Sequence, residues 1–476
     1  MSTHSSTATF DRMWADLESV GRAASGGYRR FAWTAQDAVL REWFAGEATS
    51  RGLDLVEDRV GNQWAWWWDG PGTVDEAARA GRKGVVIGSH LDSVPDGGAF
   101  DGPLGVVSSF AAVDTLRAQG VCPDVPVAVT NFVDEEGARF GIACAGSRVL
   151  TGALTADRAL ALTDAEGTTY AEALVAAGRD PRHLGADPET LARVGCFVEL
   201  HVEQGRALVD LDVPVAVASD IWPHGRWRFD FPGEANHAGT TALADRRDAM
   251  LGYAELVLAA RQVAGDRGCV ATVGKVRVTP GGVNAIPSHV TGWLDARGAD
   301  EEQVRAMVEE LTDRSGAAGA AVTQESWTPT TRFHGELSDR LVRVLAGGDT
   351  ALARSEQNAR PVGAQGSPGR DSARARSEQN ARPVGAQRAP GRGEGEAQGE
   401  APAKVSVPVL GTGAGHDAGI LAGAGIPSAM LFVRNPTGVS HSPAEHAEAD
   451  DCHAGVAALA ACVADLTGPA DPVPVP

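Results

Sequence analysis

The stretch VVIGSHLDSVPDGGAFDGPLGVVSSFAAVDTLRAQG, residues 85–120, contains the pattern that decides the fold. Its first five residues form a short, nearly continuous apolar run, as expected of a strand that is covered on both faces of a sheet. Residues 103–120 have the length and composition of a helix, with Asp101 and Gly102 just before it and Gly120 at its end. A buried strand followed by a helix is the repeating unit of α/β proteins.

Two more stretches, 125–133 and 196–202, have the same apolar texture and alternate with longer helical stretches. From about residue 213 the order changes to a strand, a helix and two further strands, which is typical of a separate α+β unit. We therefore predict an α/β protein whose larger domain, residues 1–213 and 331–476, has a mixed, mostly parallel sheet flanked by helices. A smaller α+β domain, residues 214–330, is inserted into it.

The composition excludes some classes of protein. The chain has 476 residues, with 62 acidic and 42 basic side chains and a formal net charge of −20. Affinity for phosphates needs clustered cations, so we expect no nucleic-acid partner. The first twenty residues lack the pattern of a secretion signal, and no run of about 18 apolar residues predicts a membrane helix. The six cysteines have no CxxC spacing, and we expect reduced thiols in a cytoplasmic protein.

One segment differs from the rest in composition. The sequence ARSEQNARPVGAQ at 353–365 returns letter for letter at 375–387. From residue 353 to residue 402 there is no Leu, Ile, Phe, Trp, Tyr or Met. Such a stretch cannot bury enough apolar surface to offset the entropy of ordering its backbone. We predict that 353–402 is a disordered, repeat-containing insertion.

Polar side chains follow the first predicted strand at the point where it ends. His90 and Asp92 come directly after this strand, and Asp101 precedes the next helix. Open α/β sheets place their ligand sites at this carboxyl edge of the strands. An imidazole two residues from a carboxylate suits a metal ligand with an orienting partner, because a hydrogen-bonded acid fixes the ring and raises its basicity. Taken alone, the pair is more typical of a hydrogen-bonded surface loop than of a metal site.

Three further strand ends carry similar side chains, in NFVDEEGARFG (131–141), VELHVEQG (198–205) and GVSHSPAEH (438–446). The residues concerned are Asp134, Glu135, Glu136, His201 and His441. Three consecutive acids near a core would repel one another strongly unless cations lay nearby. Each segment alone could be an acidic turn, a core histidine or a loop histidine. Four such strand exits at one sheet edge are much less expected by chance.

The four segments together predict a dinuclear metal site. One bridging carboxylate, three imidazoles and one terminal carboxylate would hold two divalent ions, and a free glutamate would remain as a base. The set contains no thiolate, which suits Zn²⁺ or Mn²⁺ without choosing between them.

The motifs HLD, DGPLG, DEEG, HVEQG, NHAG and GVSH, in this order, resemble the dinuclear-metal amidohydrolases related to aminoacylases and carboxypeptidases. Within that family, ELHVEQG, ANHAGTT, VGKVRVTPGGVNAIP and GAGHDAG resemble the branch with N-carbamoyl-L-amino acid hydrolases and allantoate amidohydrolases. The resemblance covers nearly all of the chain except 353–402. It implies that His90, Asp101 and His201 bind one metal ion and that Asp101, Glu136 and His441 bind the other.

The resemblance also implies roles for the remaining polar residues at the sheet edge. Asp92 would orient His90, and Glu135 would be the general base. Water is a poor nucleophile and nitrogen a poor leaving group, so amide hydrolysis needs an activated water and a proton donor. We expect Glu135 to take the proton from the water and to deliver it to the departing nitrogen.

The smaller domain is implied to be a lid that also forms the interface of a homodimer. His237, in NHAG, would reach an active site of the dimer, either its own or its partner's, and stabilise the oxyanion. Asn284 and Arg297 would hold the substrate carboxylate, for which an arginine offers a planar fork. Gln204 and His416 match family positions that line the substrate pocket.

These observations predict a hydrolase of a linear amide or ureido C–N bond in a small carboxylate, with allantoate or an N-carbamoyl-L-amino acid as substrate. Hydrolysis of N-acyl or N-formyl amino acids, or of dipeptides, is the alternative within the same chemistry. A metal-binding or ligand-binding protein without catalysis is the alternative from another class. A complete ligand set with an additional glutamate disfavours that last alternative, because a site without catalytic activity has no need of a general base.

Overall fold

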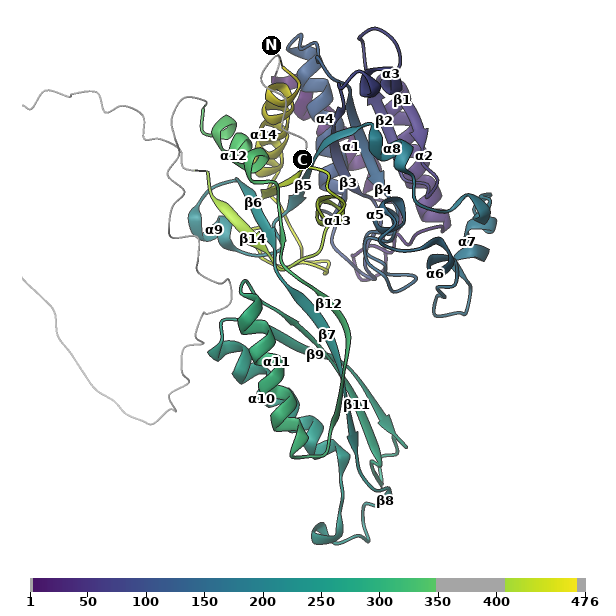
Figure 1. Cartoon of the computed structure of the whole chain (residues 1–476), viewed down its shortest axis with the longest axis vertical. Helices are drawn as coiled ribbons and strands as arrows, with labels where there is room; N and C mark the ends of the chain where they lie inside the picture. Colours follow the sequence, from purple (N-terminus) through teal and green to yellow (C-terminus); the bar gives the residue numbers. More distant parts are fainter. Residues whose placement is uncertain (1–2, 348–406, 469–476) are drawn as a thin grey trace, which may run out of the picture.

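The computed structural model describes residues 3–347 and 407–468, with side chains from residue 7 onward. The insertion predicted at 353–402 lies outside the described residues. Figure 1 shows a large upper unit, with the first and the last of the described helices, and a narrower lower unit that extends away from it. Each unit is built around a sheet of its own.

The sheet of the large unit has nine strands among the described residues. Their order is β1-β2-β4-β3-β5-β15-β6-β13, and β14 pairs with β6 outside this path. The strands are β1 (Asp54–Glu57), β2 (Gln63–Trp67), β3 (Gly84–His90), β4 (Val127–Phe132), β5 (Val194–Val202), β6 (Val215–Ile221), β13 (Thr331–Arg332), β14 (Val409–Thr412) and β15 (Ser428–Val433). The central strands β4, β3, β5 and β15 are parallel, and antiparallel pairs lie on both sides of them. The predicted α/β fold with a mixed sheet is confirmed, and its parallel part is the centre.

Successive residues of the central strands face two different helical layers. In β3, Val85 and Ile87 belong to one core and Val86 to another, as the period of two along a strand requires. The first layer contains α1 (Thr3–Leu17), α2 (Ala35–Ser50), α4 (Pro103–Ala118), α12 (Gly335–Leu345) and α14 (Ala449–Thr467). The second contains α5 (Ala145–Thr151), α6 (Ala156–Leu160), α7 (Tyr170–Ala176), α9 (Ala207–Leu211) and α13 (Asp417–Gly423). Two short helices, α3 (Val74–Arg79) and α8 (Pro188–Ala192), complete the large unit together with the 3-10 turn Pro181–His183.

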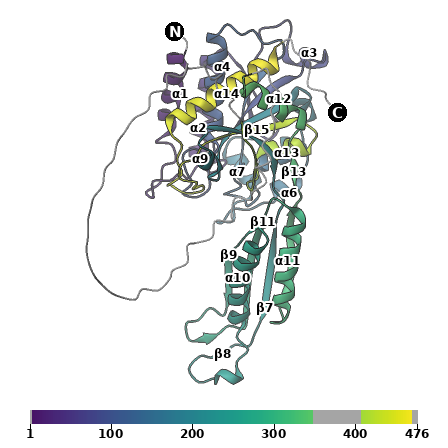
Figure 2. The ribbon, with the colours of Figure 1, turned by 90° about the vertical axis from the view of Figure 1, so that its left-hand side faces the viewer.

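The smaller unit is a four-stranded antiparallel sheet with two helices on one face (Figure 2). The strand order is β12-β7-β11-β9. The elements are β7 (His224–Pro232), α10 (Ala249–Asp266), β9 (Val270–Thr279), β11 (His289–Arg297), α11 (Glu301–Gly316) and β12 (Ala321–Thr328). In β7, Trp227, Phe229 and Phe231 are buried and alternate with more exposed residues, because only one face of the sheet is covered.

The boundary between the two units differs from the predicted one. The segment predicted as the start of the smaller domain, from residue 214, begins with β6, which belongs to the large sheet. The reason is that Ala216, Val217 and Ala218 are all fully buried, between β15 and β14. The chain leaves the large sheet after β6 and returns beside it through β13. The smaller unit therefore starts after Ile221 rather than at 214.

None of the helices in residues 3–347 and 407–468 has both the length and the apolar character needed to cross a membrane. Helix α14, with 19 residues, lies beside α4 in both views of the molecule (Figures 1 and 2). Its buried residues, among them Val456, Leu459 and Val463, belong to the first core of the large unit. The apolar side chains of this helix therefore serve the fold.

Candidate active site

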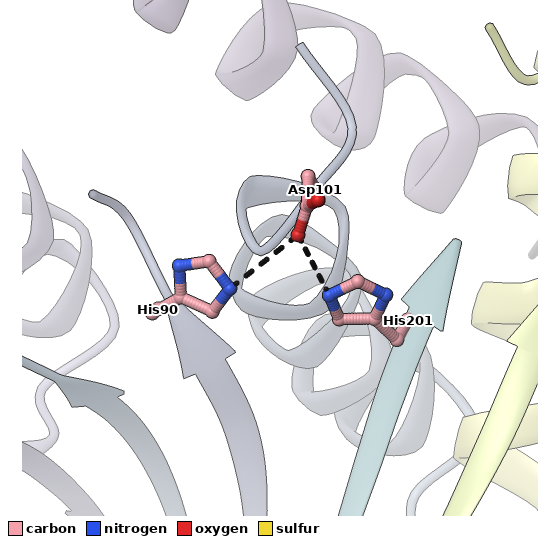
Figure 3. Close-up of side chains that lie close together, drawn as sticks. All are labelled: His90, Asp101 and His201. Atoms are coloured by element: carbon pink, nitrogen blue, oxygen red, sulfur yellow. Dashed lines mark ion pairs between the residues drawn. The ribbon is translucent and has the colours of Figure 1, made fainter. Parts of the chain in front are cut away.

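The ends of two parallel strands and the start of one helix bring three ligand-type side chains together. His90 is the last residue of β3, His201 lies near the end of β5, and Asp101 stands just before α4. Figure 3 shows both imidazoles directed at one carboxylate oxygen of Asp101. The distance from Oδ1 is 3.1 Å to His201 Nε2 and 3.7 Å to His90 Nε2. All three side chains are buried, and their ligand atoms lie within 4.8 Å of one another.

The loop before α4 can place Asp101 over the sheet edge because the next residue is a glycine. Gly102 has a φ of 85°, a left-handed conformation that side chains other than glycine rarely adopt. A Cβ atom at this position would lie 2.4 Å from Cε1 of His90. Pro103 then begins α4, where its missing N–H costs no helical hydrogen bond. The motif DGP therefore permits the close approach of Asp101 to His90.

A second group shares Asp101 and adds Glu136 and His441, again with ligand atoms within 4.8 Å. His441 Nε2 lies 3.3 Å from Asp101 Oδ2 and 3.6 Å from Glu136 Oε2. Asp101 thus directs one oxygen at each group, as a bridging carboxylate would. The side chain of His441 is 52% exposed, so the second group lies at the open side of the site.

The donor atoms of both groups fit divalent cations. His90 Nδ1 and His201 Nδ1 lie 3.2 Å and 2.9 Å from the backbone oxygens of Asp92 and Val202. Their Nε2 atoms are buried, and neither has a hydrogen-bond partner among the described residues. An imidazole held at one nitrogen by a carbonyl presents the other nitrogen to a metal. Nitrogen and carboxylate donors without a thiolate suit Zn²⁺ or Mn²⁺.

The two groups also concentrate negative charge in a buried place. Burial and the neighbouring Asp101 raise the pKa of Glu136 to about 7. The hydrogen bond to Asp101 raises the pKa of His441 to about 9, with Glu136 adding to it and burial opposing it. Carboxylates gathered away from water need compensating positive charge, which bound cations would supply.

Glu135 lies next to both groups but belongs to neither. Its Oε2 is 3.7 Å from His90 Nε2, and its Oε1 accepts a hydrogen bond from the Sγ of Cys144 at 3.4 Å. Burial raises the pKa of the Glu135 carboxyl well above its usual range, and the surrounding carboxylates add to this. A buried carboxyl that lies beside the ligand groups but belongs to neither of them has the placement needed for a general base.

Asp92 does more than the sequence predicts. Its Oδ1 lies 3.4 Å from His90 Nδ1, which fits the predicted orienting role. The same carboxylate also accepts the backbone N–H groups of Glu135 at 3.1 Å and Glu136 at 3.0 Å. Asp92 therefore connects the β3 exit to the β4 exit and holds the backbone of Glu135 and Glu136 in place.

Gln204 and His416, predicted to line the pocket, lie at the ligand groups. Gln204 Nε2 donates to Asp101 Oδ2 at 2.9 Å, so it holds the shared carboxylate, while its Oε1 is buried and no described residue pairs with it. The His416 ring lies 4.4 Å from that of His201, and neither of its buried nitrogens has a hydrogen-bond partner in the part of the chain that the structure describes. Burial and then the charge of His201 lower the pKa of His416 well below its usual value. A neutral imidazole with unsatisfied nitrogens needs a partner that a bound ligand could provide.

Arg297 stands at the end of β11, where the smaller unit meets the large one. Its Nε and Nη2 donate to Asp295 at 2.6 and 3.1 Å, and its Nη1 donates to the backbone oxygen of Gly413 at 2.7 Å. Gly413 lies three residues before His416 in the sequence. The guanidinium predicted to hold the substrate carboxylate is thus paired with a carboxylate of its own strand and spans the junction between the units.

His237 and Asn284 lie far from the ligand groups of their own chain. His237 belongs to β8 (Asn236–His237), which pairs with β10 (Ala285–Ile286) directly after Asn284. Both residues are exposed. Figure 1 shows β8 at the lower end of the small unit, opposite the large sheet. The structure therefore brings His237 and Asn284 to each other and not to Asp101.

A protein-family model described as Peptidase family M20/M25/M40 matches residues 86–465, which include both ligand groups and Glu135. The chain belongs to this family. The predicted family is therefore confirmed. Members of this family are generally metal-dependent, which agrees with the donor atoms of the two groups.

Two curated relatives match the M20 chain over nearly its whole length. One is an N-carbamoyl-L-amino acid amidohydrolase of Geobacillus stearothermophilus, 33% identical over 453 residues, which are 94% of this chain and 96% of the relative. The other is an allantoate amidohydrolase of Escherichia coli (strain K12), 27% identical over 450 residues, which are 93% of this chain and 94% of the relative. The predicted enzyme class, a hydrolase of C–N bonds, is confirmed.

A solved structure has the same arrangement of units. The crystal structure of a hydantoinase/carbamoylase family amidase from Burkholderia ambifaria matches with a TM-score of 0.71 and 28% identity. The match covers 97% of this chain and 98% of that one. The inserted smaller unit is thus part of the shared M20 fold.

One buried residue of the M20 site has no role in any of the sequence predictions. Glu445 Oε1 accepts the backbone N–H groups of Phe100 and Asp101, both at 2.9 Å, and its Oε2 lies 3.3 Å from Ser440 Oγ. Glu445 thereby links the loop that carries His441 to the loop that carries Asp101. Its position four residues after His441 is the only signal in the sequence.

Proposed function

We propose that this chain hydrolyses a linear C–N bond in a small carboxylate, with allantoate or an N-carbamoyl-L-amino acid as the substrate. The observation that carries the proposal is the position of Glu135, a buried carboxyl beside two ligand groups that share Asp101. The two relatives named as amidohydrolases of such substrates support the choice.

Two divalent cations, Zn²⁺ or Mn²⁺, belong to this proposal. His90, Asp101 and His201 would hold one of them, and Asp101, Glu136 and His441 the other. When bound, such cations act as Lewis acids toward water and the substrate carbonyl. Gln204 and Glu445 keep Asp101 in position from two sides, through its side chain and its backbone.

Glu135 moves the proton during the reaction. It takes a proton from the attacking water and delivers it to the departing nitrogen, so that the amine or ammonia leaves as a neutral group. Cys144 contacts Oε1, and Oε2 lies on the side of His90, where a water between the two groups would be in reach. Asp92 fixes the backbone of Glu135 and thus the starting point of its side chain.

The substrate would be held by residues from both units. Arg297 and Asn284 would bind its carboxylate, His416 would contact it from the large unit, and His237 would donate a hydrogen bond to the oxygen that becomes negative. Since His237 and Asn284 lie at the far end of their own chain, we assign both to the active site of a second copy. Arg297 would exchange Asp295 for the substrate carboxylate.

A homodimer through the smaller unit supplies that second copy. The small unit carries exposed apolar side chains that no described residue covers: Leu251 and Leu258 on α10 are 64% and 72% exposed, and Val270 and Val276 lie on the edge strand β9. Apolar patches of this kind mark interfaces, and an unpaired strand edge can pair with another chain. We assign the protein to the cytoplasm, in line with its cysteine pattern.

A substrate panel tests the proposal. The metal-depleted protein is reconstituted with Zn²⁺ or Mn²⁺ and given allantoate, N-carbamoyl-, N-formyl- and N-acetyl-L-amino acids and a dipeptide, and the released ammonia or amine is measured. Turnover of allantoate or an N-carbamoyl amino acid in preference to the others supports the proposal. Preference for the acylated amino acids or the dipeptide would assign the alternative substrate class. If none of these compounds is hydrolysed, the remaining interpretation is a metal-binding or ligand-binding protein without catalysis.

A further inference from the structure

The loop that carries His237 is folded around that residue. The backbone oxygen of His237 accepts the N–H groups of Thr240 at 3.4 Å and Thr241 at 3.2 Å, and the hydroxyl of Thr241 at 2.8 Å. The N–H of Ala238 donates to the backbone oxygen of Asn284. The loop from 237 to 241 is thus a closed turn attached to the strand that follows Asn284.

The turn also determines which ring nitrogen of His237 carries the hydrogen. The backbone N–H of Gly239 donates to His237 Nδ1 at 3.0 Å. A nitrogen that accepts a hydrogen bond has no hydrogen, so in this tautomer the hydrogen is on Nε2. Gly239 permits the approach, because a Cβ atom there would lie only 3.2 Å from Cε1 of the ring. His237 is therefore arranged as a hydrogen-bond donor through Nε2.

One side chain connects the two sides of this turn. Arg246 Nη2 donates to the backbone oxygens of Ala238 at 2.6 Å and Thr241 at 3.0 Å, and its Nε donates to Thr241 at 3.1 Å. These carbonyls lie on either side of Gly239. The guanidinium makes these three hydrogen bonds from two nitrogens held in one plane, whereas a lysine ammonium has all its donors on one nitrogen at the end of a flexible stem.

We propose that Arg246 is a positioning residue for the hydrolysis, which acts by holding the 237–241 turn so that His237 presents Nε2–H to the substrate oxygen. The proposal rests on the proposed function, in which His237 is the donor. Arg246 itself touches neither substrate nor ligand groups. Without it, the Ala238 and Thr241 carbonyls lose their common partner, and the Gly239 N–H no longer has a fixed place beside Nδ1. A displacement of about 1 Å can lower a rate by about 100-fold.

A double-mutant cycle tests this coupling in the full-length, metal-loaded protein. The variants are Arg246→Ala, His237→Ala and the double variant, with kcat and KM measured on the preferred substrate of the panel. We expect His237→Ala to lower kcat by about 100-fold or more, as the loss of a donor to an oxyanion does. Arg246→Ala should lower kcat by about tenfold or more with little change in KM. In the His237→Ala background, the same change should alter kcat less than about twofold, because the two residues act as one unit.

Two further variants separate positioning from a general effect of charge or folding. Arg247→Ala removes the same charge from the next position, where the exposed side chain makes no hydrogen bond or ion pair with described residues, and it should retain wild-type kcat. Arg246→Lys should recover only part of the lost rate, since one nitrogen on a flexible stem cannot reproduce the fixed three hydrogen bonds of Nε and Nη2. Metal content and sedimentation as a dimer should be unchanged in all variants.

The outcomes are distinguishable. Additive effects in the double variant, or dissociation of the Arg246→Ala dimer, would overturn the positioning role while leaving His237 as the donor. Full activity of His237→Ala would overturn the role of His237 in the proposed function, and the inference about Arg246 with it. A rate loss in Arg247→Ala equal to that in Arg246→Ala would attribute the effect to charge alone.

Discussion

The ligand groups at the sheet edge and the turn at the end of the smaller unit are organised in opposite ways. Asp101, His90 and His201 are buried, converge within one chain and are each held by further hydrogen bonds. His237 and Asn284 are exposed, and the described residues that hold them belong to neighbouring loops and strands. The first region is complete in a single chain. In the second region the turn around His237 is folded, but the ligand groups of the same chain lie far from it. A second copy of the chain would bring its own ligand groups to this turn.

The largest effect on activity is expected from a substitution beside the ligand groups at the sheet edge. Glu135→Gln removes the proton acceptor but keeps the size of the side chain and leaves all five ligand-type residues in place. Activity should fall by several orders of magnitude while metal content, measured by elemental analysis, stays near wild type. Retained activity would remove Glu135 as the base. Lost metal would show that Glu135 belongs to the ligand set.

A mixed dimer tests whether the other region acts across chains. One subunit carries Glu135→Gln and the other His237→Ala, and two different affinity tags isolate the mixed species. If His237 acts on the partner subunit, one of the two sites has both residues intact, and activity should return to about half of wild type. If it acts within its own chain, both sites remain damaged, and the mixed dimer should be as inactive as its parents.

Loss of the hydrogen bonds that hold the Asp101 loop is expected to have an intermediate effect, on metal binding. Glu445→Ala removes the acceptor of the Phe100 and Asp101 N–H groups and should weaken metal binding by about 10- to 100-fold, measured by competition with a chelator. Glu445→Gln keeps an oxygen for the two N–H groups and should lose much less. Equal metal affinity in the wild type and the alanine variant would show that the Asp101 loop holds its place without Glu445.

The smallest effects are expected at Arg297, where the smaller unit meets the large one. Arg297→Ala should raise KM for carboxylate substrates by about tenfold, the loss expected of a hydrogen bond to a charged group, with a smaller change in kcat. Asp295→Ala frees the guanidinium from its partner in β11 and should lower KM by a few-fold. An unchanged specificity constant in Arg297→Ala would exclude it from the carboxylate site.

The sequence predicts the placement of ligand-type residues well where that placement depends only on the position of a strand end. The ends of parallel strands meet at one edge, so the apolar runs before His90, Glu136 and His201 suffice to place these residues near one another. The strand preceding His441 follows the same rule. The mixed α/β fold could be predicted for the same reason, since buried strands and intervening helices differ in length and period.

Other features depend on contacts that no local pattern contains. Glu445 meets the N–H of Asp101 across 344 positions, and Asp92 meets Glu135 and Glu136 across two strand exits. The assignment of β6 to the smaller domain was wrong because its neighbours, β14 and β15, come much later in the chain. Such partners become visible only in the folded structure.

The pairing of β6 with β13 has a consequence for how the molecule could be rebuilt. Ile221 and Thr331 are direct partners, so the chain leaves and re-enters the large sheet at adjacent points. The segment between these two residues could be replaced by a short turn. Such a turn would close the chain without crossing the nine-stranded sheet. A chain shortened in this way would keep the ligand-type residues of both groups, so their metal content could be measured without the smaller unit.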